Sequence, residues 1–180
     1  TMCRQMAGDL LYYLAPKTGE DVKASMDHLI DEYILGRDDI WKSEDDSVKV
    51  IGFAQIMDDL LSKSAPGSRV ADIKVTGDLL RHGKKIKSGA FNLRKLKGRN
   101  NIIIFYTEGC HICDAEKAAA RKLVAEDHAY RVLMVNVDRI TSANPSKAEE
   151  LFDRFDLSTL PFILQTDRKG FIARRYMSLQ

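Results

Sequence analysis

Two cysteines separated by two residues are the clearest chemical feature of this 180-residue sequence. Cys110 and Cys113 lie in the stretch NIIIFYTEGCHICDAEKAAARKLV, and the only other cysteine is Cys3. Thiols at this spacing can form a reversible disulfide, because the second thiol can attack a mixed disulfide on the first. Together with His111 they also offer three potential metal ligands within four residues. Three cysteines are too few for a disulfide scaffold, so the pair indicates local chemistry, and Cys3 is assigned no role.

The elements around the pair favour redox chemistry. Residues 101–106 (NIIIFY) form a continuous apolar run, typical of a strand covered on both faces. Residues 114–127 (DAEKAAARKLVAED) are rich in helix-forming residues. Cys110 is therefore expected in the loop after a central strand, and Cys113 at the start of the next helix. Unpaired N–H groups and the helix dipole at such a helix start stabilise a thiolate, which is the nucleophilic form of cysteine.

The rest of the C-terminal part predicts an α/β fold. Further elements are expected as a strand at 69–80, a buried strand at 131–138, a helix at 144–155 and a hairpin around a turn at 167–170. From residue 101 the order is βαβα followed by ββ. This order predicts a mixed central sheet with helices on its faces.

The N-terminal part has a different character. Apolar residues at helical spacing predict helices within residues 1–64, including one in which Val22, Met26, Ile30 and Tyr33 face a core and which Gly36 ends. Residues 1–64 carry a net charge of −6 and residues 65–180 a net charge of +8. The turn-forming SAPGS at 64–68 lies between these two parts. We therefore predict a helical N-terminal extension, 1–64, followed by a second domain, 65–180.

The second domain resembles the thioredoxin superfamily, in particular the TlpA/ResA-like branch of bacterial cell-envelope thiol–disulfide oxidoreductases. One carrier of the resemblance is C-x-x-C between strand and helix, with Glu116 three residues after the second cysteine. Another is STLPFILQTDRKGFI, an x-Pro strand followed by an Asp/Gly turn and a further strand. The third is the lead-in at 66–100. The resemblance covers residues 65–180 and leaves residues 1–64 outside.

The resemblance implies a thioredoxin-like fold and a site for protein thiol or disulfide substrates. It implies that Cys110 is the nucleophile and Cys113 the resolving thiol, and that a redox partner protein regenerates the pair without a metal or organic cofactor. It also implies a cis Leu160–Pro161 bond facing the cysteines, with the backbone of Leu160 offered to an extended substrate. A periplasmic or cell-envelope location rests on the resemblance alone.

The residues that flank the thiols are expected to tune the site. Gly109 leaves room for a partner's backbone, Ile112 is expected to contact the substrate and to adjust the redox potential, and the bulk of Leu160 makes the docking surface apolar. His111 has two readings: an imidazole that stabilises the thiolate, or a side chain that points to solvent. Reductase, oxidase and isomerase share these residues, so the redox direction stays open.

Three positions depart from the thioredoxin pattern. Ile104 stands where relatives often have a buried acid, Gly109 replaces an aromatic residue, and Ala118 replaces a helix proline. Proton transfer from Cys113 is thus left to Glu116 or to water. These departures keep a second hypothesis open, a non-catalytic thioredoxin-like adaptor of the cell envelope.

Other functions find less support in the sequence. A structural zinc takes four ligands, usually from two separated pairs, and His28, His82 and His128 stand alone, so no metal site is predicted. The run 81–99 contains eight Lys or Arg and no acid, but it has one aromatic residue and no binding motif, so nucleic-acid binding is not predicted. No apolar run reaches the roughly 18 residues that a transmembrane segment needs, and no leader peptide is recognisable.

Overall fold

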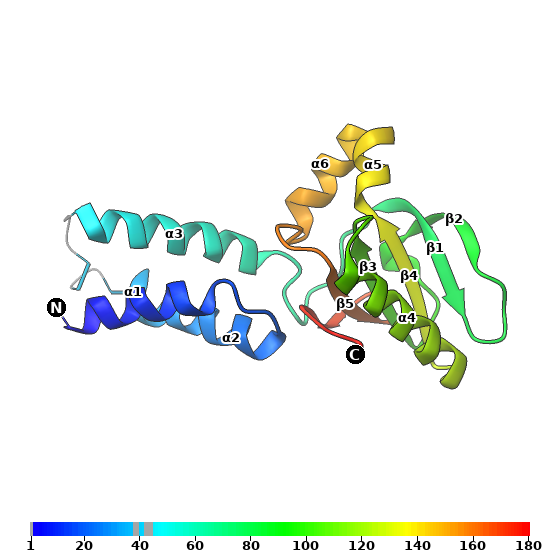
Figure 1. Cartoon of the computed structure of the whole chain (residues 1–180), viewed down its shortest axis with the longest axis horizontal. Helices are drawn as coiled ribbons and strands as arrows, with labels where there is room; N and C mark the ends of the chain where they lie inside the picture. Colours follow the sequence, from blue (N-terminus) through cyan, green and yellow to red (C-terminus); the bar gives the residue numbers. More distant parts are fainter. Residues whose placement is uncertain (1, 38–39, 42–44) are drawn as a thin grey trace. The chain divides into compact units, whose positions relative to one another are not determined.

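The computed structural model describes residues 2–37, 40–41 and 45–180. The chain divides into two compact units, Thr1–Ser62 and Lys63–Gln180, and the predicted boundary lies two residues further on, between Ser64 and Ala65. The elements of the first unit are α1 (Met2–Leu14), α2 (Glu20–Leu29), the π-helical turn η1 (Ile30–Ile34) and α3 (Asp45–Ser62). In Figure 1 these three helices, coloured blue to cyan, run alongside one another. None of the helices described is long and apolar enough to cross a membrane.

In the N-terminal unit, side chains from one face of each helix pack together. Its fully buried side chains include Leu11, Met26 and Ile30, and the rings of Tyr12 and Phe53 stack at 5.0 Å between α1 and α3. The expected buried face of the second helix is correct for Met26 and Ile30.

Tyr33 departs from that expected face, because its side chain is 44% exposed while its carbonyl accepts the indole N–H of Trp41 at 2.8 Å. The π-helical turn adds an extra residue per turn and rotates the end of the pattern. Gly36 follows this turn, as predicted, and a Cβ there would lie 2.1 Å from the carbonyl oxygen of Asp31. Only glycine fits this helix end without a shift of the backbone.

The C-terminal unit is built on one six-stranded sheet of order β2-β1-β4-β3-β5-β6. Its strands are β1 (Lys74–Arg81), β2 (Lys87–Asn92), β3 (Asn100–Tyr106), β4 (Tyr130–Asn136), β5 (Phe162–Asp167) and β6 (Ile172–Arg174). β3 and β4 are parallel, and all other neighbours are antiparallel. β3 therefore lies inside the sheet between β4 and β5, which explains its continuous apolar sequence.

Helices cover both faces of this sheet. They are the 3₁₀ turn η2 (Leu93–Lys95), α4 (His111–Glu126), α5 (Val137–Ala143) and α6 (Pro145–Arg154). Side chains of α4 pack on one face, and side chains of α5 and α6 pack on the other. The predicted class, a mixed sheet flanked by helices after a helical N-terminal region, is confirmed.

Helix α5 was not predicted. The sequence predicted a strand at 131–138, but β4 ends at Asn136 and α5 begins at the next residue. The side-chain oxygen of Asn136 accepts the N–H of Arg139 at 3.0 Å and so caps α5. The predicted strand at 69–80 also differs, since β1 begins only at Lys74 and residue 69 forms an isolated bridge with Phe171. At Asn136 a side-chain hydrogen bond thus starts a helix where the apolar pattern predicted a continuing strand.

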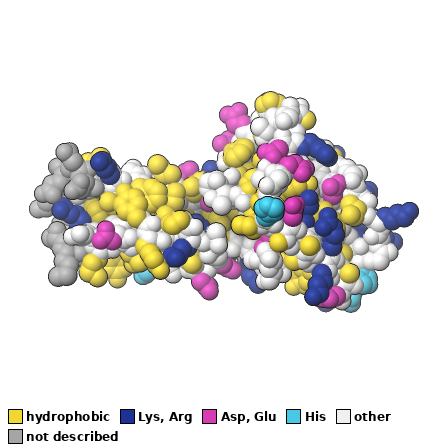
Figure 2. Space-filling model, viewed as in Figure 1, with side chains coloured by type: hydrophobic (Ala, Val, Ile, Leu, Met, Phe, Trp, Pro, Cys, Tyr) yellow, Lys and Arg dark blue, Asp and Glu magenta, His cyan; other side chains and the backbone are white. Residues whose placement is uncertain are grey.

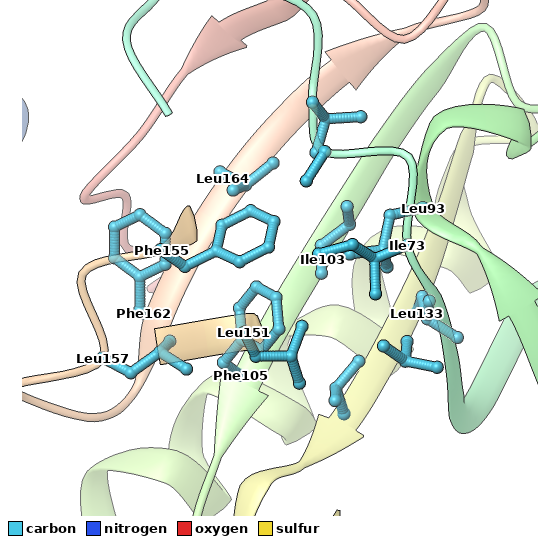
Figure 3. Packing of buried hydrophobic residues seen from close by; sticks show 14 of the residues in the cluster. Ile73, Leu93, Ile103, Phe105, Leu133, Leu151, Phe155, Leu157, Phe162 and Leu164 are labelled. Carbon is cyan, nitrogen blue, oxygen red and sulfur yellow. The ribbon is translucent and has the colours of Figure 1, made fainter. Parts of the chain in front are cut away.

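The larger core lies between the sheet and α5–α6 (Figure 3). Phe105 of β3 is fully buried, with ring centroids 4.8 Å from Phe155 and 6.3 Å from Phe162. Such contacts hold β3, β5 and the segment after α6 together. The end of β3, from which the two cysteines follow, is thereby fixed on this face.

Candidate active site

The predicted dithiol lies where β3 ends and α4 begins. Residues 101–106 are buried, and the loop of Thr107–Cys110 leads directly into the helix. Gly109 has a φ of +68°, in the left-handed region, and nothing lies within 4 Å of a Cβ added there. The strand thus provides a rigid base, and a glycine turns the chain so that Cys110 starts α4.

Cys110 is the N-cap residue of α4. Its Sγ accepts the backbone N–H of Cys113 at 3.1 Å, and its side chain is partly exposed. A sulfur in this position receives both a hydrogen bond and the positive end of the helix dipole. Of the two neighbouring cysteines, Cys110 is therefore the one that a partner sulfur can reach.

Cys113 has the opposite environment. It has no exposed surface, and it packs in the cluster between α4 and the sheet together with Ile104 and Tyr106. Its pKa is raised to about 11, mainly by burial and next by a hydrogen bond to Cys110. Cys113 therefore stays a protonated thiol at neutral pH.

Polar side chains from β4 and α5 hold the loop in front of the thiols. Asp138 accepts the hydroxyl of Thr107 and, at 3.2 Å, the backbone N–H of Glu108. Asn136 donates to the carboxylate of Glu108 at 2.7 Å. Sequence reasoning missed these residues, although parallel β3 and β4 place their carboxyl ends at the same edge of the sheet.

Leu160 and Pro161 lie at the same edge. Phe105 pairs with Phe162, so the preceding Pro161 stands beside the end of β3, and the Leu160–Pro161 peptide bond is cis. Both residues are partly exposed, and Leu160 packs against the core beneath. The backbone at Leu160 therefore lies at the edge of the sheet where β3 ends and the loop to Cys110 begins.

Glu116 has partners that the sequence did not reveal. It is 3% exposed, and its carboxylate accepts hydrogen bonds from the Ser178 hydroxyl at 2.5 Å, the Leu179 N–H at 2.7 Å and the Gln180 amide at 3.3 Å. We call residues 178–180 with Glu116 the tail clamp. A role of Glu116 in tuning the thiols stays a prediction beside this structural one.

The remaining predicted site residues surround the thiols on the outside. His111 is exposed, Ile112 is 62% exposed and Gly109 is exposed. Ile104, at the position of the buried acid of relatives, is fully buried. Gly109, His111 and Ile112 therefore form the exposed part of the site, and Cys113 lies buried among apolar side chains.

Two histidines that could serve as metal ligands are arranged differently from the prediction. His82 and His128 do not stand alone, because their rings lie 6.3 Å apart. They are brought together by the pairing of β1 and β4, which the order of elements did not predict. Among the described residues, the one group of three or more close ligand atoms is Asp27, Asp31 and Asp58 in the N-terminal unit, and it does not include the cysteines.

A comparison with protein families identifies the C-terminal unit. The family model "TraF: F plasmid transfer operon protein" matches residues 78–178, more than half of the chain. The chain belongs to the TraF family. The matched range contains Cys110 and Cys113 of this TraF-family protein, the Leu160–Pro161 bond and most of the sheet. No curated protein matches the sequence.

Several solved structures are similar to this TraF-family protein. A thioredoxin-like protein from Bacteroides caccae matches 98% of this chain and 74% of its own at a TM-score of 0.51 and 12% identity. The thioredoxin domain of a thiol–disulfide oxidoreductase from Bacteroides vulgatus matches 63% of this chain and 89% of its own, with a TM-score of 0.41 and 21% identity. A thiol:disulfide interchange protein from a Bacteroides species matches 62% of this chain and 80% of its own, with a TM-score of 0.39 and 21% identity. The fold is thioredoxin-like, and the narrower TlpA/ResA-like assignment stays a prediction.

Proposed function

We propose that this protein is a thiol–disulfide oxidoreductase that acts on protein substrates through Cys110 and Cys113. The observation that carries the proposal is the asymmetry of the two sulfurs. Cys110 is partly exposed and accepts an N–H at a helix start, whereas Cys113 is buried and has a pKa raised to about 11. Cys110 is thus suited to be the nucleophile and Cys113 to be the resolving thiol.

The proposed reaction transfers two electrons in two steps. The Cys110 thiolate attacks one sulfur of a substrate disulfide, forming a mixed disulfide and releasing the other substrate sulfur as a thiolate, which takes a proton. Cys113 then loses its proton and attacks Sγ of Cys110. The Cys110–Cys113 disulfide forms and the reduced substrate leaves. Run in reverse, the same steps oxidise a substrate dithiol.

A substrate segment is proposed to lie along the edge formed by Leu160, Pro161 and Gly109. An extended chain could pair with the backbone of Leu160 in the manner of strand addition. Exposed Ile112 would contact its apolar side chains. The thioredoxin-like fold, which the chain shares with the Bacteroides caccae protein, supports this class of substrate at the level of fold.

Location and partners belong to the same proposal. The family description names a plasmid transfer operon. We place the protein in the bacterial cell envelope, where disulfides persist, with a separate protein restoring the redox state of the dithiol. Its substrates would be envelope proteins that carry disulfides.

A redox titration tests the activity. The chain is equilibrated in glutathione or dithiothreitol buffers, and the state of Cys110 and Cys113 is read by thiol alkylation and mass. A reversible disulfide with a midpoint near about −270 mV indicates a reductant, and one between about −180 and −120 mV an isomerase or oxidant. If no intramolecular disulfide forms, the oxidoreductase proposal fails and the non-catalytic adaptor takes its place.

Two cysteine variants test the roles. Cys110→Ser is expected to abolish disulfide exchange, and Cys113→Ala is expected to accumulate mixed disulfides with a model protein substrate. Cys3→Ser, in the N-terminal unit, is the matched control and should leave both readouts unchanged. Exchange by Cys110→Ser at the wild-type rate would show that Cys110 is not the nucleophile.

A further inference from the structure

A groove lies between the end of α4 and the turn that joins β1 to β2. Its volume is about 400 Å³, and its lining includes Arg81, Lys84, Lys85 and Arg121. We call it the basic groove. Its cations come from two segments, because Arg121 belongs to α4 and the other three belong to the basic run found in the sequence. In Figure 2, Lys and Arg side chains occur over α4 and over the β1–β2 side of the unit.

The four cations of the basic groove lack acidic partners among the described residues. No Asp or Glu lines it, and in the described part of the chain no carboxylate pairs with its four cations. The Nε atom of Arg81 is buried and has no hydrogen-bond partner among the described residues. Asp127, at the C-terminal end of α4, accepts the N–H of Ala129 at 2.9 Å. A buried donor without a partner is costly, and an incoming acceptor would relieve that cost.

The floor of the basic groove is apolar. Leu80 and Val124 are 4% and 5% exposed and belong to the core cluster beneath α4, and Ile86 on the turn is 52% exposed. A ligand that fills the groove therefore needs apolar side chains as well as negative charge. No aromatic side chain lines the groove, so it lacks the stacking surfaces with which proteins hold unpaired bases.

We propose that the basic groove binds an acidic, amphipathic peptide segment of a partner protein. Its carboxylates would pair with the cations at the rim, and its apolar side chains would contact Leu80, Val124 and Ile86. Charge complementarity of this kind speeds association and excludes basic partners. The combination of an apolar floor and four cations favours such a peptide over a small inorganic anion, which would leave the floor uncovered.

The basic groove is separate from the dithiol. Arg121 follows Cys113 by eight residues on the same helix, a rise of roughly 12 Å along the axis at 1.5 Å per residue. A peptide can therefore occupy the groove without covering Cys110. The inference does not depend on the proposed redox activity, since its test measures binding alone.

The test uses the full chain and a labelled probe peptide. The probe has twelve residues of Glu and Leu at helical spacing, with a matched peptide in which every Glu is Gln. Fluorescence anisotropy at low salt gives the Kd for the wild type and for Lys85→Glu with Arg121→Glu. The charge-matched control is Arg168→Glu with Lys169→Glu, two exposed residues on the turn between β5 and β6.

The expected result is a loss of at least about tenfold in affinity for the groove variant and less than about threefold for the control, with the Gln peptide binding at least about tenfold more weakly than the probe. Amide shifts of Ile86 and Ala125 should move on titration, and those of His111 should not. If Lys85→Glu with Arg121→Glu fails to fold by circular dichroism, Lys85→Gln with Arg121→Gln replaces it.

Three outcomes overturn the proposal. Equal losses in the groove and control variants would mean that net charge alone attracts the peptide. Equal binding of the Gln peptide would mean that the cations are not used. Tighter binding of inorganic phosphate or of a short single-stranded DNA, lost in the same groove variant, would assign the site to phosphate groups instead of a peptide.

Discussion

Replacement of Glu116 by Ala removes the acceptor of the tail clamp. The carboxylate is 3% exposed and receives three hydrogen bonds from Ser178, Leu179 and Gln180. Without it, residues 178–180 lose their shared attachment to α4. The side chain of Leu179, which packs against the cluster beneath α4, is expected to leave it.

The expected loss follows from which donors can find water instead. Ser178 and Gln180 are exposed, so their polar groups can be hydrated in the variant, whereas the N–H of Leu179 is partly buried. A hydrogen bond to a charged group contributes about 1.5–3 kcal/mol. One such bond, with part of the Leu179 contact, gives an expected decrease of about 2–3 kcal/mol in the free energy of unfolding.

The assay is urea unfolding followed by circular dichroism, combined with amide hydrogen exchange at Leu179. Glu126→Ala is the matched control, because Glu126 lies on the same helix and is exposed, and it should change stability by less than about 0.5 kcal/mol. A Glu116→Ala variant as stable as the wild type, with Leu179 still protected from exchange, would refute the clamp.

A second variant separates the clamp from chemistry. Ser178→Ala removes one donor of the clamp and leaves the carboxylate of Glu116 in place. If Glu116→Ala slows the resolution of a mixed disulfide and Ser178→Ala does not, Glu116 acts on the thiols in addition to holding the tail. If both variants slow it alike, the effect passes through the position of α4.

Four further predictions concern the thiols, their loop and the core. Below pH 9 iodoacetamide should modify Cys110 much faster than Cys113. Cys113 should become reactive only as the pH approaches 11, because its raised pKa keeps its thiol protonated at lower pH. Equal rates at pH 7 would contradict this. In Cys110→Ala, Cys113 should titrate below 11, since two causes that raise its pKa are removed, and unchanged titration would show that burial acts alone. Gly109→Ala should lower stability by about 1 kcal/mol in thermal unfolding, since φ is +68°. Phe155→Ala should cost about 3–5 kcal/mol in the same assay, and a loss under 1 would mean that the core closes over the cavity.

Local pattern was sufficient for much of the fold and for the position of the dithiol. The run at 101–106 predicted β3 because it is buried on both faces, and the Ala- and Lys-rich stretch after it predicted α4. Asp167 and Gly170 predicted the hairpin turn, where Gly170 has a φ of +85° and the N–H of Gly170 bonds to the carbonyl of Asp167 at 3.1 Å. Each of these signals lies within a few residues of the element that it predicts.

The unpredicted features depend on contacts between distant segments. The tail clamp joins Glu116 to residues more than sixty positions later, and Asp138 reaches Thr107 from another strand's end. Glu116 and Asp138 look like ordinary exposed acids in the sequence, because periodicity carries no information on a specific acceptor. The pairing of β1 with β4, which brings His82 to His128, likewise depends on strand order.

Ile104 changes how the second thiol loses its proton. In its place a carboxylate would accept the proton from within the core, but Ile104 only adds to the burial that keeps Cys113 protonated. The hydrogen bond to Cys110 and the charge of Cys110 raise the pKa of Cys113 as well. Both of these causes disappear once Cys110 enters a mixed disulfide, because its sulfur is then neutral and shared. In the proposed reaction, formation of the mixed disulfide would therefore lower the pKa of Cys113 at the step that needs its thiolate.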